Sequence, residues 1–431
     1  MIESLHAPSV WLSTANPSVE LPRLQRDLYT DVAIVGGGYT GLVAAHHLSR
    51  AGVGCAVLEA NDAGWGASGR NGGMAVLRYK KPWAALAKRY GHERTRYLHF
   101  LLVEALDLLE ETVYEYRISC DFARCGHITA AHGERALTML KADVQWLESE
   151  ARDKVPRIIN ADSTAELTGT TCYAGAYVDA RAAGIHPLNY ARGLAEGLSR
   201  KGVSVYIGAE VQWLREQAAG VILETTGGIV RAKQVLVATN AYTDLVRFGT
   251  DLGSRVVPVW TSVVTTEPLP DELLRRILPQ QHVVSDTRHL LNYFRLAPEN
   301  RLLYGGRGSL TGEETPEVYE GLRRKLVETF PALTEAAIDH RWSGKVAVTR
   351  DDFPHVGRVS PRIAYAMGYG GRGVVLTNLL GKMLAELAMG KAIDAGPMSS
   401  APFGRIPLRG LRIPAMKAVA GYYGLLDRLK R

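Results

Sequence analysis

The sequence predicts an α/β (α+β) protein in which a Rossmann-like, doubly wound dinucleotide-binding domain is interleaved with a second domain built on a mixed sheet. An apolar strand over residues 31–35 runs directly into a glycine-rich turn and a helical pattern, which is the order of a nucleotide-binding βαβ unit. A second glycine-rich turn, residues 368–373, precedes an apolar helix over residues 374–389. Segments of a different pattern separate the two turns, so the nucleotide-binding domain is expected to be assembled from several pieces of the chain.

Composition and charge limit the classes of function. The chain has 431 residues, 46% of them hydrophobic, and a net charge of +7, which allows a large core and more than one domain and favours anionic ligands. No dense run of Lys and Arg with interleaved aromatic residues occurs, so we expect no nucleic-acid partner. We also find no transmembrane-length apolar run, no signal-peptide pattern, no disulfide framework and no metal-ligand spacing in the sequence, and expect a cytoplasmic protein without a metal.

The first glycine turn carries the dinucleotide fingerprint. Gly36 allows the tight turn, Gly38 lets the backbone approach a pyrophosphate, and Gly41 lets the following helix pack against the strand. The amide groups at the start of that helix favour phosphate binding. A second strand, residues 55–58, ends at Glu59, which is spaced to accept hydrogen bonds from an adenosine ribose.

Periodicity predicts the remaining elements in order. Helices are expected over residues 93–116, 134–150 and 187–201; a strand over 203–207; a hairpin over 221–224 and 229–237; strands over 256–265, 291–296 and 303–308; and helices over 374–389 and 415–429. The run 235–241 is a buried strand that ends in small residues, Ala238, Thr239 and Asn240, where the chain is expected to pass the cofactor. Val211 either lies beside the adenine or belongs to an ordinary buried strand.

Three groups of motifs carry a resemblance to a known family. Residues 65–73, Trp-Gly-Ala-Ser-Gly-Arg-Asn-Gly-Gly, follow the second strand, and residues 9–11 and 14–17 precede the fingerprint. Late in the chain come Trp342-Ser343-Gly344, residues 349–358 and the turn Gly368-Tyr369-Gly370-Gly371-Arg372-Gly373. Together they resemble the glycine/D-amino acid oxidase (DAO) superfamily of FAD-dependent oxidoreductases, in particular its gamma-glutamylputrescine oxidase-like branch. The resemblance covers nearly the whole chain and is weakest in the middle.

The resemblance implies FAD as the cofactor. The residues expected to contact it are Gly36, Gly38, Tyr39, Thr40, Gly41, Glu59, Ala60, Gly66, Ala67, Ser68, Arg70, Asn71, Gly72, Gly73, Val211, Ala238, Thr239, Asn240, Gly344, Gly370, Gly371, Arg372, Gly373 and Val374. Members of the superfamily that bind flavin covalently use a late cysteine or an early histidine. This chain has no cysteine after Cys172, and after His46 and His47 on the fingerprint helix it has no histidine before His92, so we expect FAD to be bound non-covalently.

The implied activity is oxidation of an amine or amino acid at its C–N bond, with hydride passing to flavin N5 and the imine hydrolysed afterwards. We expect a carboxylate-bearing amine such as gamma-glutamylputrescine as substrate and O2 as acceptor, giving H2O2. Two alternatives stay open: a dehydrogenase that passes electrons to a quinone or another carrier, and a flavoprotein subunit whose site is completed by a partner. Sarcosine-oxidase-like relatives have a lysine after the second glycine turn, whereas this chain has Val374 and Val375, which disfavours a simple N-methyl amino acid.

Five residues are candidates for the active site: Tyr293, Arg295, Arg350, Tyr369 and Arg372. Alternation in the strand places Tyr293 and Arg295 on one face, where an aromatic wall and a guanidinium suit an amine with a distal carboxylate; a half-buried strand with a solvated arginine is the other interpretation. Arg350 could balance charge near the flavin or bind substrate; an ordinary loop pair with Asp351 is the other interpretation. Tyr369 is expected at the flavin or in the cavity wall, and Arg372 is expected to face either substrate or solvent.

The motifs also predict domain boundaries. Residues 1–80, 175–250 and 340–405 are assigned to the FAD-binding domain, 81–174 and 251–339 to the substrate-binding domain, and 406–431 to a basic C-terminal tail. The tail either packs on its own domain or makes a peripheral contact with a membrane.

Overall fold

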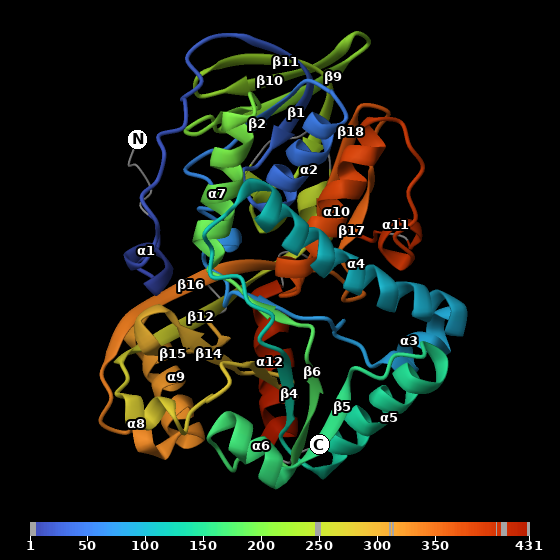
Figure 1. Cartoon of the computed structure of the whole chain (residues 1–431). Helices are drawn as coiled ribbons and strands as arrows, with labels where there is room; N and C mark the ends of the chain where they lie inside the picture. Colours follow the sequence, from blue (N-terminus) through green and yellow to red (C-terminus); the bar gives the residue numbers. More distant parts are fainter. Residues whose placement is uncertain are drawn as a thin grey trace.

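Two eight-stranded sheets form the framework of the computed structural model, which describes residues 6–245, 251–309, 312, 314–401, 403–406 and 412–428 (Figure 1). The first sheet has the order β17-β18-β11-β1-β2-β8, with β10 pairing with β11 and β9 pairing with β10. Its strands are β1 (Leu28–Val35), β2 (Cys55–Leu58), β8 (Ser204–Tyr206), β9 (Val211–Gln217), β10 (Gly220–Thr225), β11 (Gly228–Val237), β17 (His355–Arg358) and β18 (Ile363–Met367).

The centre of the first sheet is parallel, because β1, β2, β8, β11 and β18 all run in one direction. Helices α2 (Tyr39–Arg50), α10 (Gly373–Ala388), α4 (His92–Tyr116) and α7 (Pro187–Arg200) share one hydrophobic core with it. Helix α10 packs against both α2 and α4 (Figure 1). Its residues are almost all apolar, as a helix that is buried on most sides requires. A parallel sheet covered by helices, beside a second and mixed sheet, confirms the predicted fold class.

The second sheet has the order β16-β12-β15-β14-β13-β4-β6-β5 and is mixed. Its strands are β4 (His127–Ala131), β5 (Arg157–Asn160), β6 (Gly175–Asp179), β12 (Val257–Pro268), β13 (Val283–Asp286), β14 (Tyr293–Ala297), β15 (Arg301–Arg307) and β16 (Ile338–Val348). Helix α9 (Pro316–Thr329) covers one face, where Phe294 packs against Tyr304 and Phe330. The opposite face therefore is free to meet the nucleotide-binding half of the molecule.

The remaining elements connect or flank these layers. They are α1 (Val10–Ser13), β3 (Met74–Ala75), α3 (Trp83–Tyr90), α5 (Glu134–Glu150), α6 (Ala161–Thr168), β7 (Ala183–Gly184), α8 (Asp271–Leu274), α11 (Pro397–Ser400) and α12 (Arg412–Arg428). In α12, the Asp427 carboxylate accepts hydrogen bonds from the His289 and Leu290 amides, which ties this helix to the loop between β13 and β14. Among the described residues, no helix combines the length and the apolar character needed to cross a bilayer.

Strand pairing differs from the predicted boundaries at two places. Both β6 and β16 belong to the second sheet, although residues 175–250 and 340–405 were assigned to the nucleotide-binding domain. An apolar run predicts a strand but does not identify the strand with which it pairs. Here β6 pairs with β4 and β5, and β16 pairs with β12. Each pairing joins strands that are separated along the chain by at least one helix. The domain boundaries are otherwise a prediction.

Candidate functional site

The first glycine turn joins β1 to α2 under tight steric limits. Gly36 has φ +111°, and a Cβ there would lie 2.9 Å from the Ala238 carbonyl oxygen. A Cβ at Gly41 would lie 2.0 Å from the Gly36 carbonyl oxygen. Gly38 is the N-cap of α2 and has no side chain to satisfy the first amides of that helix. The turn thus presents uncapped N–H groups and a positive helix end, which suits a pyrophosphate.

Glu59, at the end of β2, is held in place by two backbone amides. Its Oε2 accepts a hydrogen bond from the Gly37 amide at 2.7 Å, and its Oε1 accepts one from the Asn61 amide at 2.9 Å. Burial raises the pKa of this carboxyl, although the two amide hydrogen bonds act in the opposite direction. The carboxylate lies against the glycine turn, and Ala60 follows it directly, as a ribose acceptor requires.

Residues 65–73 form a loop that other parts of the chain lock from several sides. The indole of Trp11 donates to the Asn71 carbonyl at 2.8 Å, and the indole of Trp342 donates to the Arg70 carbonyl at 2.9 Å. Inside the loop, the Asn71 side chain donates to the carbonyls of Ala67 and Ser68 and accepts from the Gly73 amide. The loop is therefore a rigid surface whose shape depends on residues from β16 and α1.

The second glycine turn, between β18 and α10, lies beside the first one. The hydroxyls of Thr40 and Tyr369 are 2.8 Å apart and both residues are buried, which links α2 to this turn. The Gly368 amide donates to the Asn240 side chain at 2.9 Å. A Cβ at Gly371, where φ is +90°, would meet nothing within 4 Å, so a ligand has room to approach the backbone here.

The other expected cofactor residues lie around the two turns. Ser68 Oγ accepts from the Tyr39 amide at 3.0 Å, and Gly344 packs against Arg70. Ala238 follows β11 directly and its amide donates to the Val35 carbonyl. The remaining positions are placed as follows: Gly66 lies under the Tyr242 ring, Gly72 against Tyr293, Thr239 beside Thr243, Gly370 against Lys80, Gly373 and Val374 in the first turn of α10, and Val211 buried at the start of β9.

These residues fit FAD. The structure combines a helix N-terminus whose N-cap residue, Gly38, has no side chain, a carboxylate positioned at the glycine turn, and a second glycine backbone with open space at Gly371. Hydrogen bonds within the protein hold the first glycine turn, Glu59 and residues 65–73 in place.

The structure separates the active-site candidates. The Tyr293 ring packs against Gly72 and Gly305, so it stands between the predicted flavin-contacting loop and the sheet. Arg295, on the same face, donates from Nη1 to the carbonyls of Gly73 and Ile185 and from Nε to the Leu296 carbonyl. Arg295 thus holds the loop, and a guanidinium with three backbone partners has fewer donors left for a substrate.

Arg350 and Tyr369 have surroundings that the sequence did not specify. Arg350 is exposed after β16, and its side chain makes no hydrogen bond or ion pair within the described part of the chain. Asp351 lies 3.2 Å from His355 rather than pairing with Arg350. Tyr369 points at Thr40 and is 5% exposed, and burial raises the pKa of its hydroxyl; it packs in the core rather than lining an open space.

Arg372 has the most unusual environment of the five. It is the N-cap residue of α10, directly after the second glycine turn. Its guanidinium has no hydrogen-bond or ion-pair partner among the residues that the structure describes. Burial, followed by the charge of Arg78, lowers the pKa of Arg372 to about 10. Arg372 is half-buried, and a cation withdrawn from water without a counter-ion is costly in a protein. An anionic ligand would supply the missing partner.

Sequence reasoning missed three residues: Arg78 and His127, whose charges interact with that of Arg372, and Thr129, two positions after His127 on β4. The side-chain atoms Arg78 Nη1, His127 Nδ1 and Thr129 Oγ1 are all buried without a hydrogen-bond partner in the described structure. Burial, then the charges of Arg372 and Arg78, lower the pKa of His127. No sequence motif identifies these residues. The one available signal is that a histidine and a threonine occupy alternate positions of a buried strand, His127 and Thr129.

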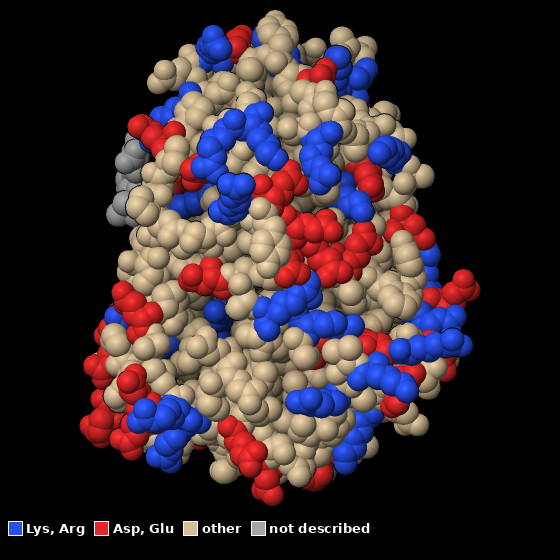
Figure 2. Space-filling view, viewed as in Figure 1, with Lys and Arg blue, Asp and Glu red and all other residues tan. Residues whose placement is uncertain are grey.

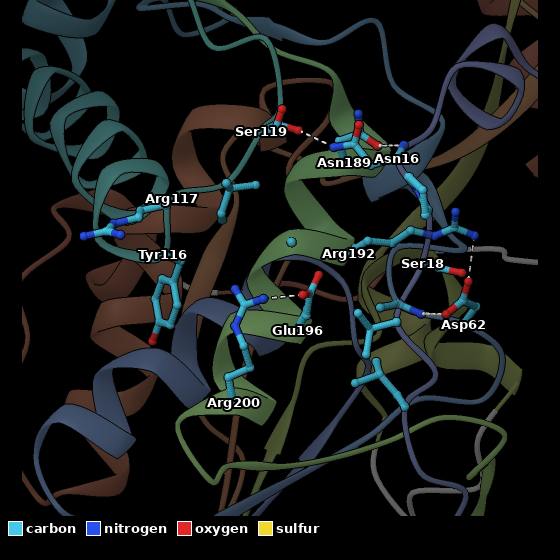
Figure 3. A pocket seen from close by; sticks show the side chains of 16 residues that line it. Asn16, Ser18, Asp62, Tyr116, Arg117, Ser119, Asn189, Arg192, Glu196 and Arg200 are labelled. Carbon is cyan, nitrogen blue, oxygen red and sulfur yellow. Dashed lines mark hydrogen bonds and ion pairs between the residues drawn. The ribbon is translucent and has the colours of Figure 1, made fainter.

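A cavity of about 210 Å³ lies elsewhere, between α7, the end of α4 and residues 16–21 (Figure 3). None of its lining residues belongs to either glycine turn or to the second sheet. Two of the arginines that line it are neutralised, because Arg192 pairs with Asp62 and Arg200 pairs with Glu196. The charge of the chain is not distributed evenly over its surface, because acidic side chains gather over α4 (Figure 2). Arg372 therefore remains the better candidate for an anion site.

Comparisons with known proteins agree with this geometry. The family described as DAO, FAD dependent oxidoreductase, matches residues 31–387. The chain is 36% identical, over 98% of its length and 99% of the relative's, to gamma-glutamylputrescine oxidoreductase of Escherichia coli (strain K12). It is 27% identical to glycine oxidase of Geobacillus kaustophilus (strain HTA426), over 86% of this chain and 96% of that protein. The crystal structure of glycine oxidase from Geobacillus kaustophilus superposes with a TM-score of 0.74 at 23% identity, covering 88% of this chain and 99% of that one. The chain thus belongs to the DAO family of FAD-dependent oxidoreductases.

Proposed function

We propose that this enzyme oxidises the C–N bond of an amine that carries a carboxylate, with gamma-glutamylputrescine as the leading example. The observation that carries the proposal is Arg372, a half-buried guanidinium without a described hydrogen-bond or ion-pair partner directly after the second glycine turn. The relative named gamma-glutamylputrescine oxidoreductase aligns over nearly the full chain and supports this substrate class. We further propose that FAD is held non-covalently, since the residues around the glycine turns supply hydrogen bonds and space.

The residues of the chain divide the work of binding and orientation. Gly36, Gly38 and Glu59 would hold the adenosine and pyrophosphate portion, and residues 65–73 with Gly370 and Gly371 would hold the ring system. When bound, FAD supplies the acceptor for the hydride that leaves the carbon next to the amine nitrogen. Water then hydrolyses the resulting imine to a carbonyl compound and an amine or ammonia.

Substrate orientation depends on charge and shape rather than on an acid–base group. Arg372 would pair with the carboxylate, because a guanidinium binds a carboxylate through parallel N–H donors. Tyr293 and the indole of Trp342 form the wall against the loop of residues 65–73. The positive end of α10 favours negative charge that develops beside the second glycine turn. In this proposal Tyr293 and Trp342 position the substrate, and Arg372 binds its carboxylate.

The test is an anaerobic titration of the FAD-loaded protein with gamma-glutamylputrescine, putrescine, N-methyl amino acids and D-amino acids, followed by the visible spectrum. Bleaching of the flavin band by gamma-glutamylputrescine, and weakly or not at all by putrescine, is the expected result. Bleaching by the α-amino acids alone would contradict the substrate class. If no amine bleaches the band, the site requires a partner, which is the rival proposal of an incomplete subunit.

Admitting air to the reduced protein then tests the electron acceptor. We propose O2, so rapid reoxidation with formation of H2O2 is expected. Slow reoxidation in air combined with fast reoxidation by a quinone would instead favour a dehydrogenase. In that case binding of vesicles through α12 becomes worth measuring, since the proposed membrane contact involves that helix.

A further inference from the structure

One face of the second sheet carries a continuous row of side chains that faces the nucleotide-binding half. Strand register places Trp342, Val263, Gly305 and Tyr293 opposite one another across β16, β12, β15 and β14. The same row continues through Ser285, Thr129 and Tyr177 on β13, β4 and β6. Trp342 and Tyr293 touch the predicted flavin-contacting loop, so this end of the row lies where oxidation would occur.

The other end of the row contains polar groups that nothing in the described structure satisfies. Thr129 is 6% exposed and His127 is 1% exposed, and both belong to β4 on the same face. The Arg78 guanidinium lies 4.5 Å over the Tyr177 ring. Arg78 Nη1, His127 Nδ1 and Thr129 Oγ1 are each buried without a hydrogen-bond partner. Buried polar atoms are almost always paired in native proteins, so three orphans at one place indicate a bound polar group.

The available donors determine which chemistry fits. Arg78 is already neutralised, because its Nη2 pairs with Asp143, which also accepts from the Trp83 amide. His127 Nε2 lies 2.8 Å from the Ser285 hydroxyl; if Nε2 accepts from that hydroxyl, Nδ1 carries the proton of the neutral ring and donates. Arg372 adds a positive charge without a described partner. Donors from arginine, imidazole and hydroxyl around an unpaired cation match a carboxylate.

We infer that Arg78, His127 and Thr129, together with Arg372, form a distal subsite that binds the substrate carboxylate about two strand spacings away from the oxidised carbon. This inference rests on the proposed function for the identity of the oxidised end. Neighbouring strands lie about 4.8 Å apart, so Tyr293 on β14 and Thr129 on β4 are separated by about 10 Å. An extended chain covers about 3.5 Å for every three bonds, so the amine and the carboxylate are joined by about eight bonds.

The first test measures binding without turnover. The probe is the monobutylamide of glutaric acid, which has a carboxylate but no amine, and the control ligand is N-butylpentanamide, which lacks the carboxylate. Calorimetry on the FAD-loaded wild type is expected to show tighter binding of the acid. Thr129→Val and His127→Phe should each weaken binding of the acid about ten-fold and leave binding of the control ligand unchanged. Thr129→Ser, which keeps the hydroxyl, should bind the acid as tightly as the wild type.

The matched control is Thr168→Val in α6, whose hydroxyl bonds within its own helix and is buried to a similar extent. Arg78 is left unchanged, because its removal would strand the buried Asp143 carboxylate. Equal affinity for the two ligands in the wild type would overturn the subsite. The subsite would also be overturned if the Thr129→Val protein, shown by circular dichroism to be folded, binds the acid as tightly as the Thr168→Val protein does.

The second test measures length. A series of ω-amino acids is used to reduce the flavin anaerobically, and the rate at low substrate concentration is expected to peak at about seven methylenes. A maximum at the shortest members would overturn the spacing. If no amine reduces the flavin while the glutaric acid probe still binds in a Thr129-dependent way, the proposed oxidation fails and the subsite stands. If amines with and without a carboxylate reduce the flavin equally fast, the proposed oxidation stands and the subsite fails.

Discussion

At the scale of single residues, Arg372 distinguishes this site from a merely structural arrangement. Most arginines of the described structure have carboxylate or carbonyl partners, for example Arg295 with the carbonyls of Gly73 and Ile185. Arg372 has a position beside the second glycine turn and a pKa lowered to about 10 by burial and by the charge of Arg78. The protein therefore maintains an electrostatic cost at this position that an anionic substrate would relieve.

Replacing Arg372 tests this at once. Arg372→Met is expected to raise the dissociation constant of a carboxylate-bearing amine about ten- to hundred-fold, since hydrogen bonds to charged groups are worth about 1.5–3 kcal/mol. The limiting rate of flavin reduction should change little, because the guanidinium anchors the substrate. Anaerobic stopped-flow reduction separates the two quantities. Arg350→Met is the matched control, and an equal effect of both variants would argue against a specific anchor.

Glu59 yields a second prediction, on the affinity for FAD. Glu59→Gln should weaken FAD binding about ten-fold, because the ribose loses a charged acceptor. Burial raises the pKa of Glu59, so protonation begins at a higher pH than for an ordinary glutamate. The dissociation constant of FAD should therefore rise as the pH falls, and this pH dependence should be absent from Glu59→Gln. Quenching of flavin fluorescence measures both, and parallel pH profiles would contradict the assignment.

At the scale of elements, the contact between β1 and α2 depends on the absence of a side chain. A Cβ at Gly41 would lie 2.0 Å from the Gly36 carbonyl oxygen and 3.1 Å from Ile34. Because backbone atoms cannot yield, α2 would have to move away from the sheet. That movement would also disturb the hydroxyl contact between Thr40 and Tyr369, so both glycine turns would change together.

We therefore expect Gly41→Ala to destabilise the protein by about 2 kcal/mol or more and to abolish FAD retention during purification. The control is Gly321→Ala in α9, where a Cβ would meet nothing within 4 Å. That change should stabilise slightly, by about 0.5–1 kcal/mol, since alanine is the better helix former. Thermal unfolding and flavin content are the measurements. A stable Gly41→Ala protein with full FAD would refute the close packing of α2.

At the scale of the whole molecule, Asp153 ties together layers that are distant in sequence. It pairs with His99 of α4 at 2.9 Å and with Arg181, between β6 and β7, at 2.7 Å. Burial alone would raise the pKa of Asp153, but hydrogen bonds from His99 and from the Val155 amide and the charge of Arg181 outweigh it. Together they lower the pKa to about 2. The folded state thus favours the ionised carboxylate.

The sign of the pH dependence follows from this lowered pKa. Asp153 stabilises the folded state when the pH is above the unfolded pKa, and that contribution is lost as the pH falls from about 4 towards 2. Asp153→Asn should reduce the free energy of unfolding by about 2 kcal/mol at pH 7, and the difference should shrink at pH 3. Urea unfolding with saturating FAD measures it. Exposed Glu148→Gln on α5 is the control and should have no effect at either pH.

The sequence by itself determined the local parts of this protein. The first glycine turn, Glu59, the strand over residues 55–58 and the helix over 134–150 follow from side-chain size and from short-range periodicity, and the structure has both elements at these bounds. The family also followed from the sequence, because its motifs at residues 65–73 and 368–373 are contiguous and specific. All of these signals lie within stretches of about twenty residues, over which local patterns are informative.

Only the tertiary structure decided which distant segments meet. It assigned β6 and β16 to the second sheet, directed Arg295 to backbone carbonyls, and brought Arg78, His127 and Thr129 close to Arg372. Alternation in a strand shows which residues share a face, but the partner of a strand is chosen by packing over the whole core. The proposed recognition of a carboxylate depends on that choice, because its four residues come from three segments that are far apart in the chain: Arg78, strand β4 with His127 and Thr129, and Arg372 at the start of α10.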